Sequence, residues 1–239
     1  MFCSAIDLEK LEYRDLTTNR SGGKMVQVST VPGSADWNDK LRFQMSEDDQ
    51  THLQTAVWPL STPLQNQDGS RRTLELTVES PALDDFLATL DAKNIDMASD
   101  KSEDWFKKKL DRPTVEGMYV YMRKVSENGM KPTVKVKVGC GSTRPTNIFV
   151  VTNVDAQSGA LTYVRGTHDD LGKGIKALVM VETTGLWFMN RTFGMSLNAT
   201  EILVFPQKRN ASGIIAFTLS KNIRSLRDEN TEETRDMEM

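Results

Sequence analysis

The side chains in this sequence that could support acid–base or metal chemistry gather in GTHDDLGKG, residues 166–174. His168 is one of two histidines in the chain, and Asp169 and Asp170 follow it. A histidine beside two carboxylates could act as a general base with an orienting partner, or could bind a metal ion. A polar turn between strands accounts for the same residues without any chemistry, and we favour that interpretation.

Other catalytic patterns are incomplete. GKGIK at 172–176 lacks the first glycine and the Lys-Ser/Thr end of a phosphate-binding loop, and GCGS around Cys140 lacks the spacing of a nucleophile elbow. The carboxylates form no cluster suited to two-metal chemistry. Neither Cys3 nor Cys140 has a partner at disulfide or zinc spacing, which is typical of a reducing compartment. We therefore expect no enzyme, no metal and no cofactor.

Charge is unevenly distributed along the chain, although the net formal charge is only −3. Residues 1–100 carry nine Lys/Arg against seventeen Asp/Glu, whereas residues 101–145 carry eleven against five. A second basic stretch, 208–226, has four Lys/Arg and no acid. Aromatic residues are interleaved with the first basic cluster. Cations displace counterions from phosphates and aromatic faces stack on any base, so this combination indicates a site for single-stranded nucleic acid.

We predict a nucleic-acid-binding site made of basic and aromatic side chains. The predicted contacts are Lys107, Lys108, Lys109, Arg123, Lys124, Lys135, Lys137, Trp105, Tyr121, Trp187 and Phe188. Plainer explanations exist for several of them. Lys107–Lys109 could be the solvated face of a helix, Trp105 could be core, and Lys135 and Lys137 could protect a strand edge. Their co-occurrence in one acidic protein favours the binding site.

Hydrophobic periodicity predicts the elements that would carry these side chains. KMVQVSTV (24–31), RRTLELTVES (71–80) and KPTVKVKV (131–138) alternate apolar and polar residues as half-buried strands do. SPALDDFLATLDAKNI (80–95) has the period of an amphipathic helix, with Ser80 as its cap. We expect two further helices, one from a capping box at Asp100 through DWFKKKL (104–110) and one from Arg112.

The second half of the chain predicts a run of strands separated by Gly or Asn. They are NIFVVTNV, ALTYVRG, GIKALVMVE, GLWFMNR, ATEILVF and GIIAFTL. Such regular spacing is typical of a sheet curled into a barrel or sandwich. The expected fold is α+β, mostly β, with one domain over 1–226 and a helical insertion at about 80–124. Residues 227–239, with six acids against two arginines, are expected to form a disordered acidic tail.

The segment GLWFMNRTF (185–193) raises a question of strand faces. Successive side chains of a strand point to opposite sides, so Trp187 and Phe188 cannot both fill the core or both form a stacking surface. Met189 shares the face of Trp187, as does Phe193 if the strand runs that far. Leu186 shares the face of Phe188. The sequence leaves open which aromatic faces the lysines.

Three ordered motifs resemble a family encoded by large DNA viruses of algae and protists. They are WFKKKL…VEGMY (105–119), KPTVKVKV (131–138) and GIKALVMVETTGLWFMNRTFGMSLNATEILVFP (174–206). The resemblance covers roughly residues 100–206 and implies an OB-fold single-stranded DNA-binding protein of the viral replication machinery. It implies that Lys107, Lys108, Lys135, Lys137, Trp187 and Phe188 lie near the binding groove. It also implies an intracellular location, in the cytoplasm or nucleus of an infected host cell.

The expected function is therefore non-enzymatic, sequence-tolerant binding of single-stranded DNA, with RNA as a second candidate ligand. The acidic tail would compete for the groove and dock replication proteins, and homo-oligomers remain open. No segment approaches 18 uncharged apolar residues, so we expect no membrane partner. The alternative is a virion or protein-interaction component whose aromatics are core and which binds no nucleic acid.

Overall fold

The protein is represented by a computed structural model. It describes residues 2–19, 22–31, 39–46, 53–57, 71–125, 128–141, 143–155, 157–172, 174–183, 185–205, 208–209 and 215–216. The chain divides into two compact units, Met1–Phe205 and Pro206–Met239. In the second unit, β15 (Lys208–Arg209) pairs antiparallel with β16 (Ile215–Ala216). The predicted acidic tail at 227–239 lies outside the described residues.

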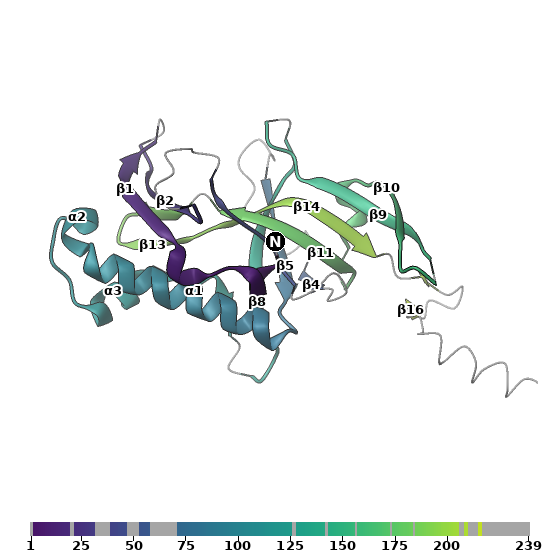
Figure 1. Cartoon of the computed structure of the whole chain (residues 1–239), viewed down its shortest axis with the longest axis horizontal. Helices are drawn as coiled ribbons and strands as arrows, with labels where there is room; N and C mark the ends of the chain where they lie inside the picture. The colour runs from purple at the N-terminus through teal and green to yellow at the C-terminus, as the bar shows by residue number, and fades with distance from the viewer. Residues whose placement is uncertain are drawn as a thin grey trace, which may run out of the picture. The chain divides into compact units, whose positions relative to one another are not determined.

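The described residues of the first unit form a larger sheet of nine strands. In spatial order they are β10 (Leu161–Arg165), β9 (Asn147–Val154), β14 (Leu197–Phe205), β11 (Lys176–Thr183), β4 (Leu53–Val57), β5 (Arg71–Thr77), β8 (Thr133–Gly139) and β7 (Arg123–Lys124), with β3 (Leu41–Gln44) also paired to β11. Figure 1 labels β4, β5, β8, β9, β10, β11 and β14 of this sheet. The strands predicted at 71–80, 131–138 and from 147 to 205 all lie in this sheet, apart from the one at 185–191.

Five strands of this sheet close into a ring. β14 pairs with β11 on one side and with β8 on the other, which completes the circuit β14–β11–β4–β5–β8. The closing contact is parallel, with Leu197 opposite Val136 and Ala199 opposite Val138. Most of the buried side chains described on the ring are aliphatic: Leu74, Leu76, Val134, Val136, Val138, Ala177, Val179, Val181, Leu197, Ala199, Ile202 and Val204. The predicted mostly β architecture with a curled sheet is therefore confirmed.

The second sheet has five strands. Its order is β1 (Glu12–Thr18), β2 (Lys24–Ser29), β12 (Leu186–Met189), β13 (Thr192–Met195) and β6 (Tyr119–Val120). The predicted strand at 185–191 ends at Met189, because Asn190 adopts a left-handed conformation with φ of 56° and the chain reverses into β13. Phe193 therefore does not continue the strand of Trp187. It lies on β13 beside Phe188 and is fully buried.

Two of the places where the chain passes between the two sheets are corners on either side of the hairpin β12–β13. At the first, between β11 and β12, Gly185 has a φ of +123° and lies so close to β2 that a Cβ would be 2.0 Å from the Val26 carbonyl oxygen. This conformation and this approach both require glycine. At the second corner, Ser196 alone separates β13 from β14.

Three helices lie between β5 and β6: α1 (Pro81–Asp100), α2 (Ser102–Phe106) and α3 (Arg112–Met118). Ser80 caps α1, with its Oγ accepting from the Leu83 amide at 3.1 Å, as predicted. Figure 1 shows α1 running along the sheets, with α2 and α3 at its C-terminal end. The inner face of α1 is buried, and Phe86 contacts Phe43 of β3 edge to face at 5.0 Å between ring centroids.

The predicted boundaries of the second helix are wrong. α1 continues to Asp100, and the cap of α2 is Lys101 without a side-chain hydrogen bond, so the predicted capping box at Asp100 is absent. α2 ends at Lys107, whose φ of 60° is left-handed. Lys107, Lys108 and Lys109 are therefore an exposed loop after a one-turn helix and not a helical face.

Candidate nucleic-acid groove

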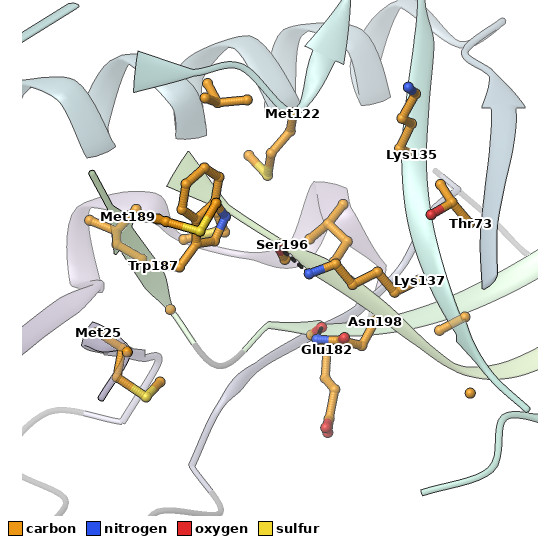
Figure 2. A pocket seen from close by; sticks show the side chains of 18 of the residues that line it. Met25, Thr73, Met122, Lys135, Lys137, Glu182, Trp187, Met189, Ser196 and Asn198 are labelled. Carbon is orange, nitrogen blue, oxygen red and sulfur yellow. Dashed lines mark hydrogen bonds between the residues drawn. The ribbon is translucent and has the colours of Figure 1, made fainter. Parts of the chain in front are cut away.

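An open groove of about 1140 Å³ runs along the first unit where the two sheets meet. We call it the groove. Its lining comes from strands of both sheets, together with the corner residues Gly185 and Ser196. The contributing strands are β2, β6, β12 and β13 of the five-stranded sheet and β5, β7, β8, β9, β11 and β14 of the larger one. Figure 2 shows Lys135 and Lys137 on one side, Trp187, Met189 and Met25 on the other, and Asn198 and Glu182 between them.

The groove concentrates positive charge in a protein that is acidic overall. Among the described residues that line it, six are cationic and one is a carboxylate, Glu182. The cations are Lys24, Arg123, Lys124, Lys135, Lys137 and Arg144. Within the described part of the chain, no ion pair engages Lys24, Lys124, Lys135 or Arg144. Exposed cations that line one groove provide a favourable electrostatic surface for a polyanion.

Strand register explains how the larger sheet contributes to the groove. Residues directly opposite one another on paired strands share a face. Lys137 is opposite Thr73 on β5 and opposite Asn198 on β14, and Asn198 is opposite Glu182 on β11. We call Thr73, Lys137, Asn198 and Glu182 the polar row. Lys137 Nζ donates to Ser196 Oγ at 3.0 Å, which fixes the ammonium at the second corner.

Glu182 is the acidic end of the polar row, and two cations engage it. Lys40 Nζ lies 3.2 Å from Oε1, and Arg42 Nη2 lies 3.0 Å from Oε2. Burial by itself would raise the pKa of Glu182, but the hydrogen bonds from Arg42 and Lys40 outweigh it, so that the pKa is lowered. The carboxylate stays ionised at neutral pH, and both of its oxygens are paired with cations.

Two carboxylates on α1 position the wall of the groove around residues 119–124. Asp84 Oδ2 accepts from Arg123 Nη1 at 2.6 Å. Asp91 Oδ1 accepts from the Tyr119 hydroxyl at 2.6 Å and from the Met122 amide at 3.4 Å. Asp91 is 2% exposed, and its burial raises its pKa to about 6 despite these hydrogen bonds. The arrangement ties a segment of the groove wall to the helix behind it.

The structure brings seven of the eleven predicted site residues together. Arg123, Lys124, Lys135, Lys137, Tyr121, Trp187 and Phe188 all line the groove. Their charges are not equivalent, because Arg123 is engaged by Asp84. Tyr121 is 49% exposed, and its hydroxyl donates to Glu116 at 2.8 Å.

Four predicted site residues do not line the groove. Lys107, Lys108 and Lys109 are exposed but belong to the loop after α2. Trp105 is 5% exposed and packs edge to face against Phe188 at 5.7 Å between ring centroids. The assignment of Trp105 to a stacking surface is therefore corrected: it is a core side chain, because α2 directs it toward the aromatic cluster under the five-stranded sheet.

The question left open for Trp187 and Phe188 is answered by their contacts. The Phe188 ring packs against Phe106 at 5.6 Å and is stacked on Phe193 at 5.5 Å between centroids. Its neighbour Leu186 on the same face is fully buried. Trp187 and Met189 point the other way, into the groove, and Met189 is 64% exposed (Figure 2). Phe188 thus faces the core, with part of it at the groove, and Trp187 faces the lysines.

Several groove residues were missing from the sequence-based prediction. Lys24 and Met25 come from the acidic first hundred residues, and Arg144 precedes β9 in the loop GCGSTRPT. Met189 and Asn198 also line the groove. Arg144 carried a signal, because it belongs to the basic cluster at 101–145. Lys24 and Met25 carried none, since only the pairing of β2 with β12 places them there.

The residues first considered for catalysis serve local structure. His168–Asp170 form a short 3-10 turn, in which Asp170 Oδ2 accepts from the Thr167 amide at 2.7 Å. His168 Nε2 lies 3.2 Å from the Gly139 carbonyl oxygen. Burial raises the pKa of the Cys140 thiol, which disfavours the thiolate that a nucleophile needs. Across the described residues, no group of three or more His, Cys, Asp or Glu side chains is arranged to hold a metal ion.

Within the described ranges, the model contains no helix that is both long enough and apolar enough to span a bilayer.

Comparison with known proteins places the chain in a family but gives it no established activity. Residues 63–213 match the model of a family of unknown function, DUF5871, and the chain belongs to this family. No curated protein matches.

Among solved structures, the chain is similar to the single-stranded DNA-binding protein from bacteriophage Enc34. Its complex with ssDNA has a TM-score of 0.39 and 7% identity, over 83% of this chain and 98% of that one. A C-terminal truncation of the same phage protein has a TM-score of 0.37 and 7% identity, over 84% and 97% of the two chains. A third structure of it has a TM-score of 0.35 and 6% identity, over 81% and 89%.

Proposed function

We propose that this protein binds single-stranded DNA in the groove, without base-sequence preference and without catalysis. The observation that carries the proposal is the composition of the groove: six cations against one carboxylate that is already paired, facing exposed apolar and aromatic side chains. Phosphate neutralisation combined with base stacking is the chemistry by which proteins bind single strands.

The architecture supports the same proposal. The ring has five strands, the same number as an OB-fold barrel. OB folds bind oligonucleotides on an outer face of the barrel. We include in the proposal a role in viral DNA replication or recombination, with replication proteins docking on residues 227–239. RNA as a second ligand and homo-oligomer formation also belong to it.

A titration of the full chain tests binding directly. Fluorescence anisotropy with labelled oligo-dT, repeated at several salt concentrations, should show binding at low salt that weakens steeply as salt rises. Absent binding at low salt, or an affinity independent of salt, would contradict the proposal. A virion or interaction protein would instead show no oligonucleotide binding and a defined assembly by light scattering.

The chain offers two matched sets of lysines for assigning the binding to the groove. Replacing Lys124, Lys135 and Lys137 by Gln removes three groove charges, whereas replacing Lys107, Lys108 and Lys109 by Gln removes three charges elsewhere. The groove variant should lose roughly tenfold or more in affinity near 50 mM salt, with a salt slope shallower by about 2, since each phosphate contact contributes about 0.7. The control variant should bind nearly as the parent does. Equal losses in both variants would show that net charge, not the groove, governs binding.

A further inference from the structure

The five-stranded sheet presents a row of its own to the groove. Trp187 is directly opposite Met25 on β2 and opposite Gly194 on β13, and Gly194 is opposite Val120 on β6. Because paired residues share a face, these four positions lie in one line across four strands. We call Met25, Trp187, Gly194 and Val120 the apolar row. Met25, Trp187 and Val120 line the groove, and Val120 is 45% exposed.

Gly194 gives this row its shape. A Cβ built at Gly194 would lie 3.0 Å from Cζ2 of Trp187 and 2.8 Å from the Val120 carbonyl oxygen. The distance to the carbonyl oxygen is shorter than Cβ contacts allow, and the distance to the indole is at the tight end of such contacts. The indole of Trp187 therefore extends across its own strand onto β13, over a position that has no side chain. A Cβ at position 194 would require the indole to shift by a few tenths of an ångström.

The core-facing residues next to the apolar row fix the direction in which Trp187 points. Phe188 is opposite Phe193, and Phe193 is opposite Tyr119, and these rings pack together in the core. Rotation of β12 to bury Trp187 would expose that cluster. Trp187 itself makes no ring–ring contact within the described residues, so the outer side of its indole has no aromatic neighbour there. Its direction is thus set by the core side of the same strand.

The polar row and the apolar row face the groove from different sides. Figure 2 shows Lys135 and Lys137 across the groove from Trp187 and Met189. A single strand of nucleic acid has the same two-sided chemistry, with phosphates along one edge and unstacked bases along the other. Lysines match the phosphate edge, and an indole flanked by methionine side chains matches the faces of bases.

We infer that Trp187, laid across Gly194 and flanked by Met25 and Met189, is the base-stacking platform of the groove, and that the phosphates follow Lys124, Lys135 and Lys137. This inference rests on the proposed function and adds an orientation to it. Trp187 contacts the bases, whereas Gly194 is a positioning residue that acts through the indole. Since every base has a flat face, the platform does not select a base sequence.

Two probes of equal length separate stacking from phosphate binding. The first is labelled oligo-dT, and the second is an oligomer with the same number of phosphates and abasic sites throughout. The wild-type chain should bind oligo-dT roughly five- to hundredfold more tightly than the abasic oligomer, because stacking on an aromatic side chain contributes about this factor for each base. Both probes should show the same salt slope, since their phosphates are the same.

Substitutions at two positions assign that preference to the platform. Trp187→Leu should abolish the preference for oligo-dT without changing the salt slope, and Trp187→Phe should retain a large part of it. Gly194→Ala should lower the preference by less than Trp187→Leu does, because it displaces the indole without removing it. Because its Cβ also approaches the Val120 carbonyl, its thermal unfolding is measured alongside. Should Gly194→Ala fail to fold, the two Trp187 variants still decide the question.

The outcomes separate this inference from the function on which it rests. If wild type binds both probes equally with a steep salt slope, or if Trp187→Leu keeps the full preference for oligo-dT, the platform is refuted and groove binding stands. If neither probe binds at low salt, the proposed function fails and the platform fails with it.

Discussion

The polar row and the apolar row arise from the same strand alternation but present opposite chemistry to one groove. Lys137 in the polar row stands between Val136 and Val138, both fully buried, and Trp187 in the apolar row stands between buried Leu186 and the core-facing Phe188. In each case the core side of the strand is aliphatic or aromatic and fixes the direction of the groove side. The two rows therefore differ in the residue types at their outward positions.

The outward positions of the strands are where selection for binding could act. Changing an outward residue leaves the core side of the strand untouched, so charge and stacking surface can be set independently of the fold. A protein with acidic composition can thereby hold a cationic groove. The rows also differ in their structural requirements. An outward lysine needs only its place on a strand, whereas the Trp187 indole lies beside Gly194, a position without a side chain.

The largest effect is expected where both rows depend on one residue, at Gly185 in the first corner. With a φ of +123° and a Cβ that would meet the Val26 carbonyl oxygen at 2.0 Å, Gly185→Ala must displace β12 from β2. We expect a loss of about 3 kcal/mol or more in the free energy of unfolding, measured by urea denaturation.

A glycine elsewhere provides the control for this prediction. Gly117 lies in α3, and a Cβ there would meet nothing within 4 Å. Gly117→Ala should stabilise the protein by roughly 0.5–1 kcal/mol, since alanine favours the helix. Equal effects of the two substitutions would mean that the corner is not under the constraint described.

The sequence predicted which side chains of each row point outward, but not how the strands of each row are paired. The alternation in KPTVKVKV correctly predicted that Lys135 and Lys137 point away from a core of valines. The alternation in LWFM predicted that Trp187 and Phe188 face opposite ways. Neither pattern contains long-range register, so nothing local indicated that Met25 pairs with Trp187 or that Gly194 lies beneath the indole. The first contact joins residues far apart in the chain, and the second depends on the turn at Asn190, which lies inside the predicted strand 185–191.

The errors have local causes of a different kind. Lysine favours helices, so the run Lys107–Lys109 suggested a helical face, but the left-handed Lys107 ends α2 before it. The interleaving of Trp105 with these lysines suggested stacking, whereas its burial follows from packing against β12 and β1. The sequence shows that these residues are basic and aromatic, but composition alone does not indicate whether each one lies on the surface or in the core.

A smaller effect should distinguish the carboxylates that support the two rows. Burial raises the pKa of Asp91, behind the Val120 end of the apolar row, to about 6, whereas in the unfolded chain an aspartate titrates near 4. Between about pH 4 and 6 the folded state therefore keeps a proton that the unfolded state has lost. The contribution of this group to stability is present in full below about pH 4 and is lost as pH rises through 6.

Asp91→Asn removes that titration. As pH rises from 4 to 7, the variant should gain up to roughly 3 kcal/mol in stability relative to wild type, because only wild type loses stability through this titration; urea denaturation at a series of pH values measures this. The sign is opposite for Glu182 in the polar row, where the lowered pKa means that stability is lost as pH falls. Parallel pH profiles for wild type and Asp91→Asn would show that Asp91 does not titrate in this range.

The smallest effect is expected from making the polar row more uniformly basic. Glu182→Gln removes the carboxylate from the groove lining and frees the charges of Lys40 and Arg42. Because a polyanion is attracted by each added net positive charge, affinity for oligo-dT at low salt should rise about two- to fivefold. Glu201→Gln on β14 is the control: it makes the same charge change at an exposed residue that does not line the groove, and it should leave binding nearly unchanged. If Glu182→Gln instead weakened binding, the ion pairs of Glu182 with Lys40 and Arg42 would have to orient the polar row. The polar row would then depend on positioning contacts, as the apolar row depends on Gly194.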